Sequence, residues 1–335
     1  MSTTEVADQQ QKPNLLKRLN LSGQQNGVWL VLLVVLAVAW IVAGPNFLST
    51  GNITNMMVRA VPLGIVAMGQ TTVILAGSID LSVAYLISVS AVITAVTLDG
   101  DPSNIPMAVA MALLVGIGVG LVNGVLVTKG RANPLIATLG TGLLMNGYLA
   151  SEVSGRAGSA PSEFQLLGYG RVMGFLPLSV ILLLVVFLIT WWLTRGTRFG
   201  AHLYAIGGSK DIARLSGVRD DRVIIGAHIW CSVTAALTGM FLVARTSSAH
   251  ALMGQNGVYD LESIAAVVVG GTALLGGKGG AVGTLAGVLL LAVLDNFFNA
   301  MQVDGFLKNV LRGAIIIIAV ASYALRSTRK DVDIA

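Results

Sequence analysis

The segment TRGTRFGAHLYAIGGSKDIARLSGVRDDR, which is Thr194–Arg222, is an island of charge in an otherwise apolar chain. Apolar runs that carry no charge and are long enough to cross a bilayer lie on both sides of it. The sequence therefore predicts membrane-spanning helices that are joined by this polar segment. Because cytoplasmic loops of membrane proteins are rich in Lys and Arg, we expect residues 194–222 to lie in the cytoplasm.

A short helix is predicted inside this island, from Lys210 to Ser216. Ser209 can cap its N-terminus, and Gly217 can end it. Ile212 and Leu215 are three residues apart, so their side chains share one face. A capped helix that presents two apolar side chains in the cytoplasm is suited to docking, and we expect it to dock into a separate motor protein. The residues expected at this contact are Ser209, Lys210, Asp211, Ile212, Ala213, Arg214, Leu215, Ser216 and Gly217.

Composition places the whole chain in the class of helical membrane proteins. Of its 335 residues, 55% are hydrophobic and only 11% are charged, whereas a soluble domain carries roughly 25% charged residues. A β-barrel is excluded because its strands alternate apolar and polar residues, and the apolar runs here are unbroken. The net charge of +5 is explained by basic cytoplasmic loops, so no nucleic-acid partner is expected. The single cysteine, Cys231, excludes an intrachain disulfide.

We predict an all-α bundle of about ten transmembrane helices, formed by residues 28–326. Tails at 1–27 and 327–335 are predicted to be cytoplasmic. The last three runs are short or interrupted by glycine, so they must include flanking residues to reach the roughly 20 residues that a bilayer requires. The runs are Val28–Gly44, the uncharged segment between Arg59 and Asp80, Leu81–Leu98, Ile105–Val127, Pro134–Ser151, Leu176–Leu193, Val223–Ala244, Ser263–Leu275, Ala281–Phe298 and Gly313–Leu325.

The distribution of positive charge predicts the orientation of this bundle. An even number of spans puts both termini on one side of the membrane. With both termini in the cytoplasm, fifteen of the 21 Lys and Arg residues lie in cytoplasmic segments and six lie outside. This excess supports the orientation. The six external residues are Arg59, Arg156, Arg171, Arg245, Lys308 and Arg312.

No enzymatic motif is present, so no catalytic residue, cofactor or metal is expected. The segment Gly276–Gly279 resembles part of a phosphate-binding loop, but Thr272 replaces the first glycine and Gly279 replaces the magnesium-binding hydroxyl. His202, His228 and His250 lack the spacing of metal ligands. With enzymatic and metal-binding motifs excluded, transport of a solute across the membrane is the remaining function.

Polar residues inside the predicted spans indicate the nature of the cargo. Ion-coupled carriers usually hold carboxylates inside their helices, but here Asp80 and Asp295 lie at span ends and Glu262 lies outside. Amides and hydroxyls suit a neutral, hydroxylated solute, because they form hydrogen bonds without a countercharge. Each of them could equally hold helices together. The candidates for a translocation pathway or gate are Gln70, Thr71, Ser78, Asp80, Ser82, Asn123, Asn146 and Asn296.

Asp80 has two interpretations. In one, Gly77–Ser82 interrupts two helices, and Asp80 accepts hydrogen bonds from nearby backbone N–H groups and anchors a gate. In the other, Asp80 caps the third span at the cytoplasmic interface. Either role would offset the cost of a carboxylate beside a span.

Glycines are predicted to act in two ways. Gly116, Gly120 and Gly124 are four residues apart and are expected to form a helix-packing face. Gly270-Gly271 and Gly276–Gly280 could interrupt helices near a pathway.

Four stretches in this order resemble ABC importer permeases of the ribose type, over about residues 46–323. The chain departs from the usual pattern at Ser78 and Ala84, where that family has glycine, and at Ser209-Lys210, where it has Asn-Glu. The stretches are QTTVILAGSIDLSV (Gln70–Val83), GLVNGVLVTKGRANPLIATLGT (Gly120–Thr141), YAIGGSKDIARLSGV (Tyr204–Val218) and YDLESIAAVVVGGTALLGGKGGAVGT (Tyr259–Thr284).

The resemblance implies a multi-pass permease subunit of the bacterial inner membrane that carries a monosaccharide or related polyol. It implies three partners besides lipid: a second permease subunit, expected to be an identical copy, a cytoplasmic ABC ATPase that hydrolyses the ATP, and a periplasmic sugar-binding protein. It also implies that the island Thr194–Arg222 engages the ATPase. Two alternatives stay open, namely a secondary carrier or facilitator that works without ATP, and a membrane scaffold or receptor subunit without flux.

Overall fold

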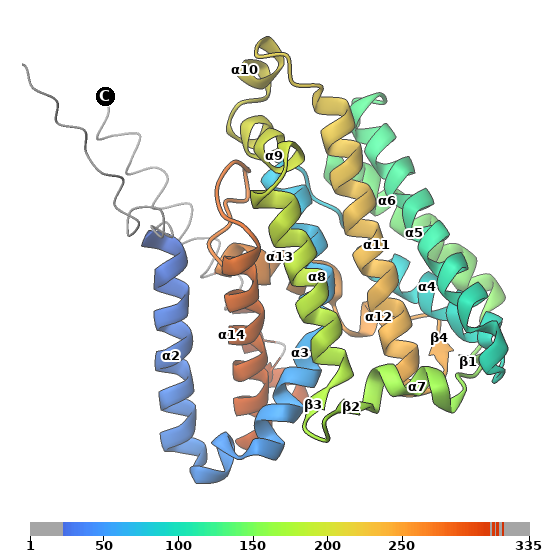
Figure 1. Ribbon diagram of the computed structural model, residues 1–335, viewed down its shortest axis with the longest axis vertical. Helices are drawn as coiled ribbons and strands as arrows, with labels where there is room; N and C mark the ends of the chain where they lie inside the picture. Colours follow the sequence, from blue (N-terminus) through green and yellow to red (C-terminus); the bar gives the residue numbers. More distant parts are fainter. Residues whose placement is uncertain (1–22, 309, 312, 315–316, 318–335) are drawn as a thin grey trace, which may run out of the picture.

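The computed structural model describes residues 23–308, 310–311, 313–314 and 317, and within them the protein is a bundle of α-helices (Figure 1). Short 3-10 turns, η1 (Pro45–Leu48) and η2 (Pro102–Asn104), precede two of the helices. The helices are α2 (Gly23–Ala43), α3 (Thr50–Leu75), α4 (Val83–Leu98), α5 (Ile105–Thr128), α6 (Pro134–Glu152), α7 (Ser162–Tyr169), α8 (Leu178–Arg195), α9 (Arg198–Gly208), α10 (Lys210–Leu215), α11 (Asp220–Thr246), α12 (Met253–Asn256), α13 (Tyr259–Val269) and α14 (Ala281–Ala300).

Among the described residues, five helices are long and apolar enough to cross a membrane: α3, α5, α8, α11 and α14. Two shorter apolar helices, α2 and α4, accompany them. The prediction of an all-α membrane protein is therefore confirmed. Most of the expected run Gly313–Leu325 lies outside the described residues, as do the tail segments 1–22 and 327–335.

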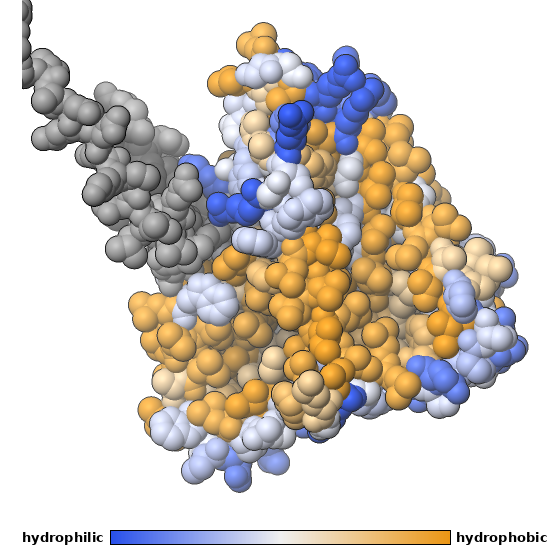
Figure 2. Space-filling model, viewed as in Figure 1, coloured by the Kyte–Doolittle hydropathy of each residue, from blue (hydrophilic) through white to orange (hydrophobic). Residues whose placement is uncertain are grey.

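The bundle is built around α3 and α11, with α4 enclosed beside them. The second half of α3 is buried without interruption from Ala60 to Leu75. On α4 only Val96 is exposed before the helix ends. The outer helices α5 and α8 carry apolar side chains on their exposed surface, and Figure 2 shows this surface as a broad hydrophobic region below the polar α9–α10 end. A bilayer would cover such a region.

The glycine face on α5 packs against α11, as expected. A Cβ atom on Gly120 would lie 2.5 Å from the Ile229 Cα atom, and one on Gly124 would lie 2.7 Å from the Ile225 Cα atom. Only glycine allows two helix backbones to approach so closely.

Two expected helix boundaries are wrong. Helix α3 begins at Thr50, so Arg59 lies inside it rather than before it. The expected run Ser263–Leu275 is replaced by the 11-residue helix α13, which ends at Val269. Residues 270–280 form a loop in which Gly271, Gly276, Gly277, Gly279 and Gly280 adopt positive φ angles. The glycine segments therefore do interrupt the helices.

The end of the bundle opposite α10 carries the only strands in the described part of the chain. The segment Glu152–Gly174 contains α7 and two strands. Strand β1 (Arg156–Ala157) pairs with β4 (Ala249–His250), and β2 (Arg171–Val172) pairs with β3 (Leu176–Pro177). These pairs tie the lower ends of the helices together (Figure 1).

Candidate functional site

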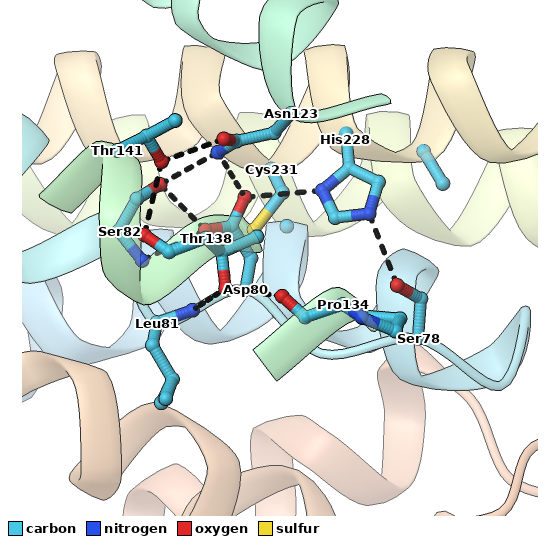
Figure 3. A network of polar contacts seen from close by, with 12 residues as sticks. Ser78, Asp80, Leu81, Ser82, Asn123, Pro134, Thr138, Thr141, His228 and Cys231 are labelled. Carbon is cyan, nitrogen blue, oxygen red and sulfur yellow. Dashed lines mark hydrogen bonds and ion pairs between the residues drawn. The ribbon is translucent and has the colours of Figure 1, made fainter. Parts of the chain in front are cut away.

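A buried polar network surrounds the interruption between α3 and α4 (Figure 3). The chain leaves α3 through Gly77, whose φ angle is +73°, and α4 begins only at Val83. Asp80, in this interruption, has no exposed surface. Its Oδ1 atom accepts hydrogen bonds from the backbone N–H of Ser82, at 2.9 Å, and from the Ser82 hydroxyl. The chain therefore does break between the two helices, and Asp80 bonds to the backbone at the start of α4 from a fully buried position.

Helices α5 and α6 supply the next contacts of the network. The Asn123 Nδ2 atom donates to Ser82 Oγ at 2.9 Å and reaches Asp80 Oδ2 at 3.4 Å. Asn123 Oδ1 in turn accepts a hydrogen bond from Thr141 at 2.7 Å. Thr138 Oγ1 accepts the backbone N–H of Leu81 at 3.0 Å. The break is thus bonded to both helices through backbone and side-chain groups.

His228, on α11, completes the network and is the member that sequence reasoning missed. Its Nδ1 atom lies 3.2 Å from Asp80 Oδ2, and its Nε2 atom lies 3.0 Å from Ser78 Oγ. The histidine is fully buried. The available signal was a titratable side chain within the apolar run Val223–Ala244, since such residues are rare inside spans and are usually paired there.

The eight residues predicted for a translocation pathway or gate do not all lie in contact with one another. Ser78, Asp80, Ser82 and Asn123 meet in the network, while the other four lie in separate contacts between helices. Gln70 accepts a hydrogen bond from Cys231 Sγ at 3.2 Å, and Thr71 and Thr284 share one at 2.8 Å. Asn146 accepts from Gln255 Nε2 at 3.0 Å, and Asn296 donates to Asn52 Oδ1 at 3.1 Å.

The central members of the network, Asp80, Asn123 and His228, have no exposed surface, so the network is suited to holding the break rigidly. A buried carboxylate is stable only when nearby donors satisfy it, and Asp80 has donors from its own segment, from α5 and from α11. The network therefore connects the break to three helices.

The second candidate site is α10, which projects from the polar end of the bundle (Figures 1 and 2). Ser209 is extended, and its hydroxyl accepts the Ile212 N–H at 3.4 Å, as the cap prediction requires. Ala213 is buried, whereas Ile212 and Leu215 are 66% and 90% exposed. Two large apolar side chains therefore point into solvent from a six-residue helix.

Ion pairs brace α10 against α11. Arg214 donates two hydrogen bonds to the Asp220 carboxylate, from Nε at 3.1 Å and from Nη2 at 2.9 Å. Lys210 Nζ lies 3.4 Å from the same carboxylate, so this lysine also has an acidic partner on α11. The hydrogen bond from Arg214 to Asp220 and the charge of Asp220 raise the pKa of Arg214. Lys129 pairs with Asp221 beside this brace.

A backbone crossing, which we call the glycine junction, connects the island to the interior. It consists of Leu75, Gly77, Gly207, Gly276 and Gly277. The Gly277 N–H donates to the Leu75 carbonyl at 3.0 Å. A Cβ atom on Gly207 would lie 2.0 Å from that carbonyl oxygen and 2.3 Å from the Gly277 nitrogen. Helix α9, the α3–α4 break and the α13–α14 loop therefore meet without intervening side chains.

With this geometry established, the comparisons with known proteins identify the family. A family model described as "Branched-chain amino acid transport system / permease component" matches residues 52–320. The chain belongs to this permease family. No solved structure matches it.

Curated relatives of this chain include import permeases for sugars. The permease is 38% identical to the ribose import permease protein RbsC of Escherichia coli (strain K12), over 87% of this chain and 91% of the relative. It is 32% identical to the D-allose transport system permease protein AlsC of the same strain, over 88% and 90%. It is 31% identical to the galactose/methyl galactoside import permease protein MglC, over 92% and 96%. The predicted resemblance and the location in the bacterial inner membrane are confirmed.

Proposed function

We propose that this chain is the membrane-spanning subunit of an ATP-driven importer that carries a monosaccharide into the cell. The cargo is a ribose-like pentose, a hexose or a related polyol. The printed names of the relatives support this class, since they concern ribose, D-allose and galactose. Hydrolysis of ATP takes place on a separate ABC ATPase in the cytoplasm.

The observation that carries the proposal is the exposure of Ile212 and Leu215 on a braced, capped helix. Apolar side chains on a polar end of a membrane protein are stabilised when a partner buries them. An ATPase domain that docks there would move α10, and α10 follows α9 directly at Ser209.

The glycine junction gives this movement a route into the membrane. Gly207 on α9 contacts the last carbonyl of α3 and the loop before α14. A shift of α9 would therefore displace both segments together. The Asp80 network would keep the break attached to α5, α6 and α11 during that shift, which is the gate-anchoring role proposed for Ser78, Asp80, Ser82 and Asn123. Such coupled tilting of packed helices is a common form of alternating access.

The proposal also includes a topology and two further partners. In this proposal the chain has ten spans, with both termini in the cytoplasm. It pairs with a second, identical permease subunit and receives its cargo from a periplasmic sugar-binding protein. The excess of positive charge on the α10 side supports the orientation.

Reconstitution with and without the ATPase tests the proposal. Proteoliposomes that contain the permease, its ATPase and its binding protein should accumulate sugar only when ATP is supplied on the α10 side. Accumulation by the permease alone would identify a secondary carrier, equilibration without ATP would identify a facilitator, and no flux in the complete system would favour a scaffold or receptor subunit.

A further inference from the structure

A cleft of about 300 Å³ opens between α3, α13 and α14. This volume is at the lower end of the roughly 300–1,000 Å³ typical of small-molecule sites. Its lining combines groups that the sequence had placed at span ends or in loops. The polar and aromatic lining residues are Arg59, Asn256, Tyr259, Glu262, Asp295 and Phe298.

The cleft lies far from the coupling helix. Along α3, Arg59 precedes the glycine junction at Leu75 by 16 residues, which corresponds to about 24 Å of helix. Along α14, Asp295 is 14 residues beyond Ala281, which corresponds to about 21 Å. The two helices thus run side by side from the junction toward the end opposite α10 (Figure 1). In the proposed orientation the cleft faces the outside of the cell.

Three charged residues from three helices surround this cleft. Arg59 is the tenth residue of α3, Glu262 is the fourth of α13, and Asp295 is the fifteenth of α14. Ionisable groups inside membrane helices are costly unless they pair or face a water-filled cavity, and there they mark solute pathways. Arg59 and Asp295 also line a neighbouring cavity with Asn299, Asp304 and Lys308, so the polar lining continues toward the end of α14.

The lining chemistry fits a neutral polyhydroxylated solute. Carboxylates of Glu262 and Asp295 accept hydrogen bonds from hydroxyl groups, and the guanidinium of Arg59 donates them. The ring of Phe298 offers an apolar face to the C–H groups of a sugar. Two acidic groups against one basic group give the cleft a net negative charge, which disfavours an anionic solute.

We propose that this cleft is the site at which a neutral monosaccharide first enters the permease from the side opposite α10. The inference rests on the proposed function and assigns the outer solute site to α3, α13 and α14. Helix α13 connects this cleft to the glycine junction, because the loop that follows its C-terminal end contributes Gly276 and Gly277 to that junction.

Cysteine labelling tests the location and the ligand on the full chain in proteoliposomes. The one native cysteine, Cys231, is fully buried, so it provides an unreactive background. Ala292→Cys, in the cleft wall, should react with a membrane-impermeant methanethiosulfonate reagent added on the side opposite α10. D-ribose, D-allose or D-galactose should slow this reaction about fivefold or more at saturation. The control Ser103→Cys, in the exposed turn η2 of the same end, should react at a rate that no sugar changes.

The assignment would be wrong if none of the three sugars protected Ala292→Cys from the reagent, or if only the cation choline protected it. It would also be wrong if the reagent labelled Ala292→Cys only from the α10 side. The labelling needs no ATPase, so it tests the cleft even when the reconstituted importer proves inactive.

Uptake separates this proposal from the proposed function. In a transporting system, Glu262→Gln or Asp295→Asn should lower sugar uptake about tenfold, as expected for loss of a hydrogen bond from a charged group. The control Glu163→Gln, on the exposed face of α7, should transport normally. Normal uptake by both cleft variants would reject the cleft while the importer function stands, and absence of uptake by the unmodified assembly would reject the importer function itself.

Discussion

Asp80 and His228 are separated by 148 residues in the sequence, yet Asp80 Oδ2 and His228 Nδ1 lie 3.2 Å apart where neither side chain has any exposed surface. The contact joins the α3–α4 break to α11, the helix around which α3, α4 and α5 pack. Breaking a buried pair of this kind costs more than the pair contributes, because the remaining partner keeps its desolvation penalty.

Asp80→Asn should destabilise the permease by about 3 kcal/mol and abolish uptake. The asparagine preserves the shape of the side chain, but its NH₂ group would face the donors of Ser82 or Asn123. Thermal unfolding in detergent and uptake in proteoliposomes measure the two effects. The control is Asp99→Asn, at the exposed C-terminal cap of α4; equal unfolding temperatures for the two variants would show that the network adds no stability.

Gly120→Ala should destabilise the bundle by about 1–3 kcal/mol, because the new methyl group would overlap the α11 backbone at Ile229. Gly118→Ala, on the same helix, has open space within 4 Å of the new Cβ and should be neutral or slightly stabilising. Thermal unfolding of the two variants side by side is the measurement. A Gly120→Ala protein as stable as Gly118→Ala would mean that α5 and α11 are not in close contact.

Gly207→Ala should uncouple ATP hydrolysis from uptake, because its Cβ atom would collide with Leu75 and Gly277 at the glycine junction. Its neighbour Gly208 has nothing within 4 Å of a Cβ atom, so Gly208→Ala should couple normally. The ratio of sugar transported to ATP hydrolysed distinguishes them. If both variants keep the ratio of the unmodified protein, the junction is not a route for the movement.

Ile212→Asp and Leu215→Asp should each abolish ATP-driven uptake while membrane insertion stays intact. The substitutions place a charge on the exposed apolar face that we expect the ATPase to bury, and burial of an unpaired charge costs several kcal/mol. Copurification of the ATPase and uptake are the measurements. Leu166→Asp, on the exposed face of α7, controls for a general effect of surface charge, and full transport by the α10 variants would contradict the docking assignment.

Local signals were sufficient to predict α10. The helix was expected at Lys210–Ser216 and is found at Lys210–Leu215, with Ser209 as the cap and Gly217 at a φ angle of +82°. Caps and terminal glycines act within a few residues, so a single sequence contains them. The same holds for the glycine face of α5, whose spacing is visible in the chain.

The contacts of Asp80 and the position of Arg59 were not predictable in this way. The partners of Asp80 come from α5 and α11, and nothing local indicates that these helices meet at the break. Arg59 was placed before a span because a charge in lipid is costly, but in the structure it lies inside α3 and faces a polar cleft. Both the contacts of Asp80 and the position of Arg59 depend on tertiary packing, which hydropathy alone does not predict.

The contact between Asp80 and His228 also constrains the order in which the protein can assemble during synthesis. At a synthesis rate of about 5–20 residues per second, the 148 residues that separate Asp80 from His228 take on the order of ten seconds to emerge. During that interval the carboxylate is already among apolar helices while its imidazole neighbour has not yet been translated. Until α11 arrives, Asp80 has only the donors of Ser82 and Asn123 within the protein, and water or the insertion machinery must supply the remaining hydrogen bond.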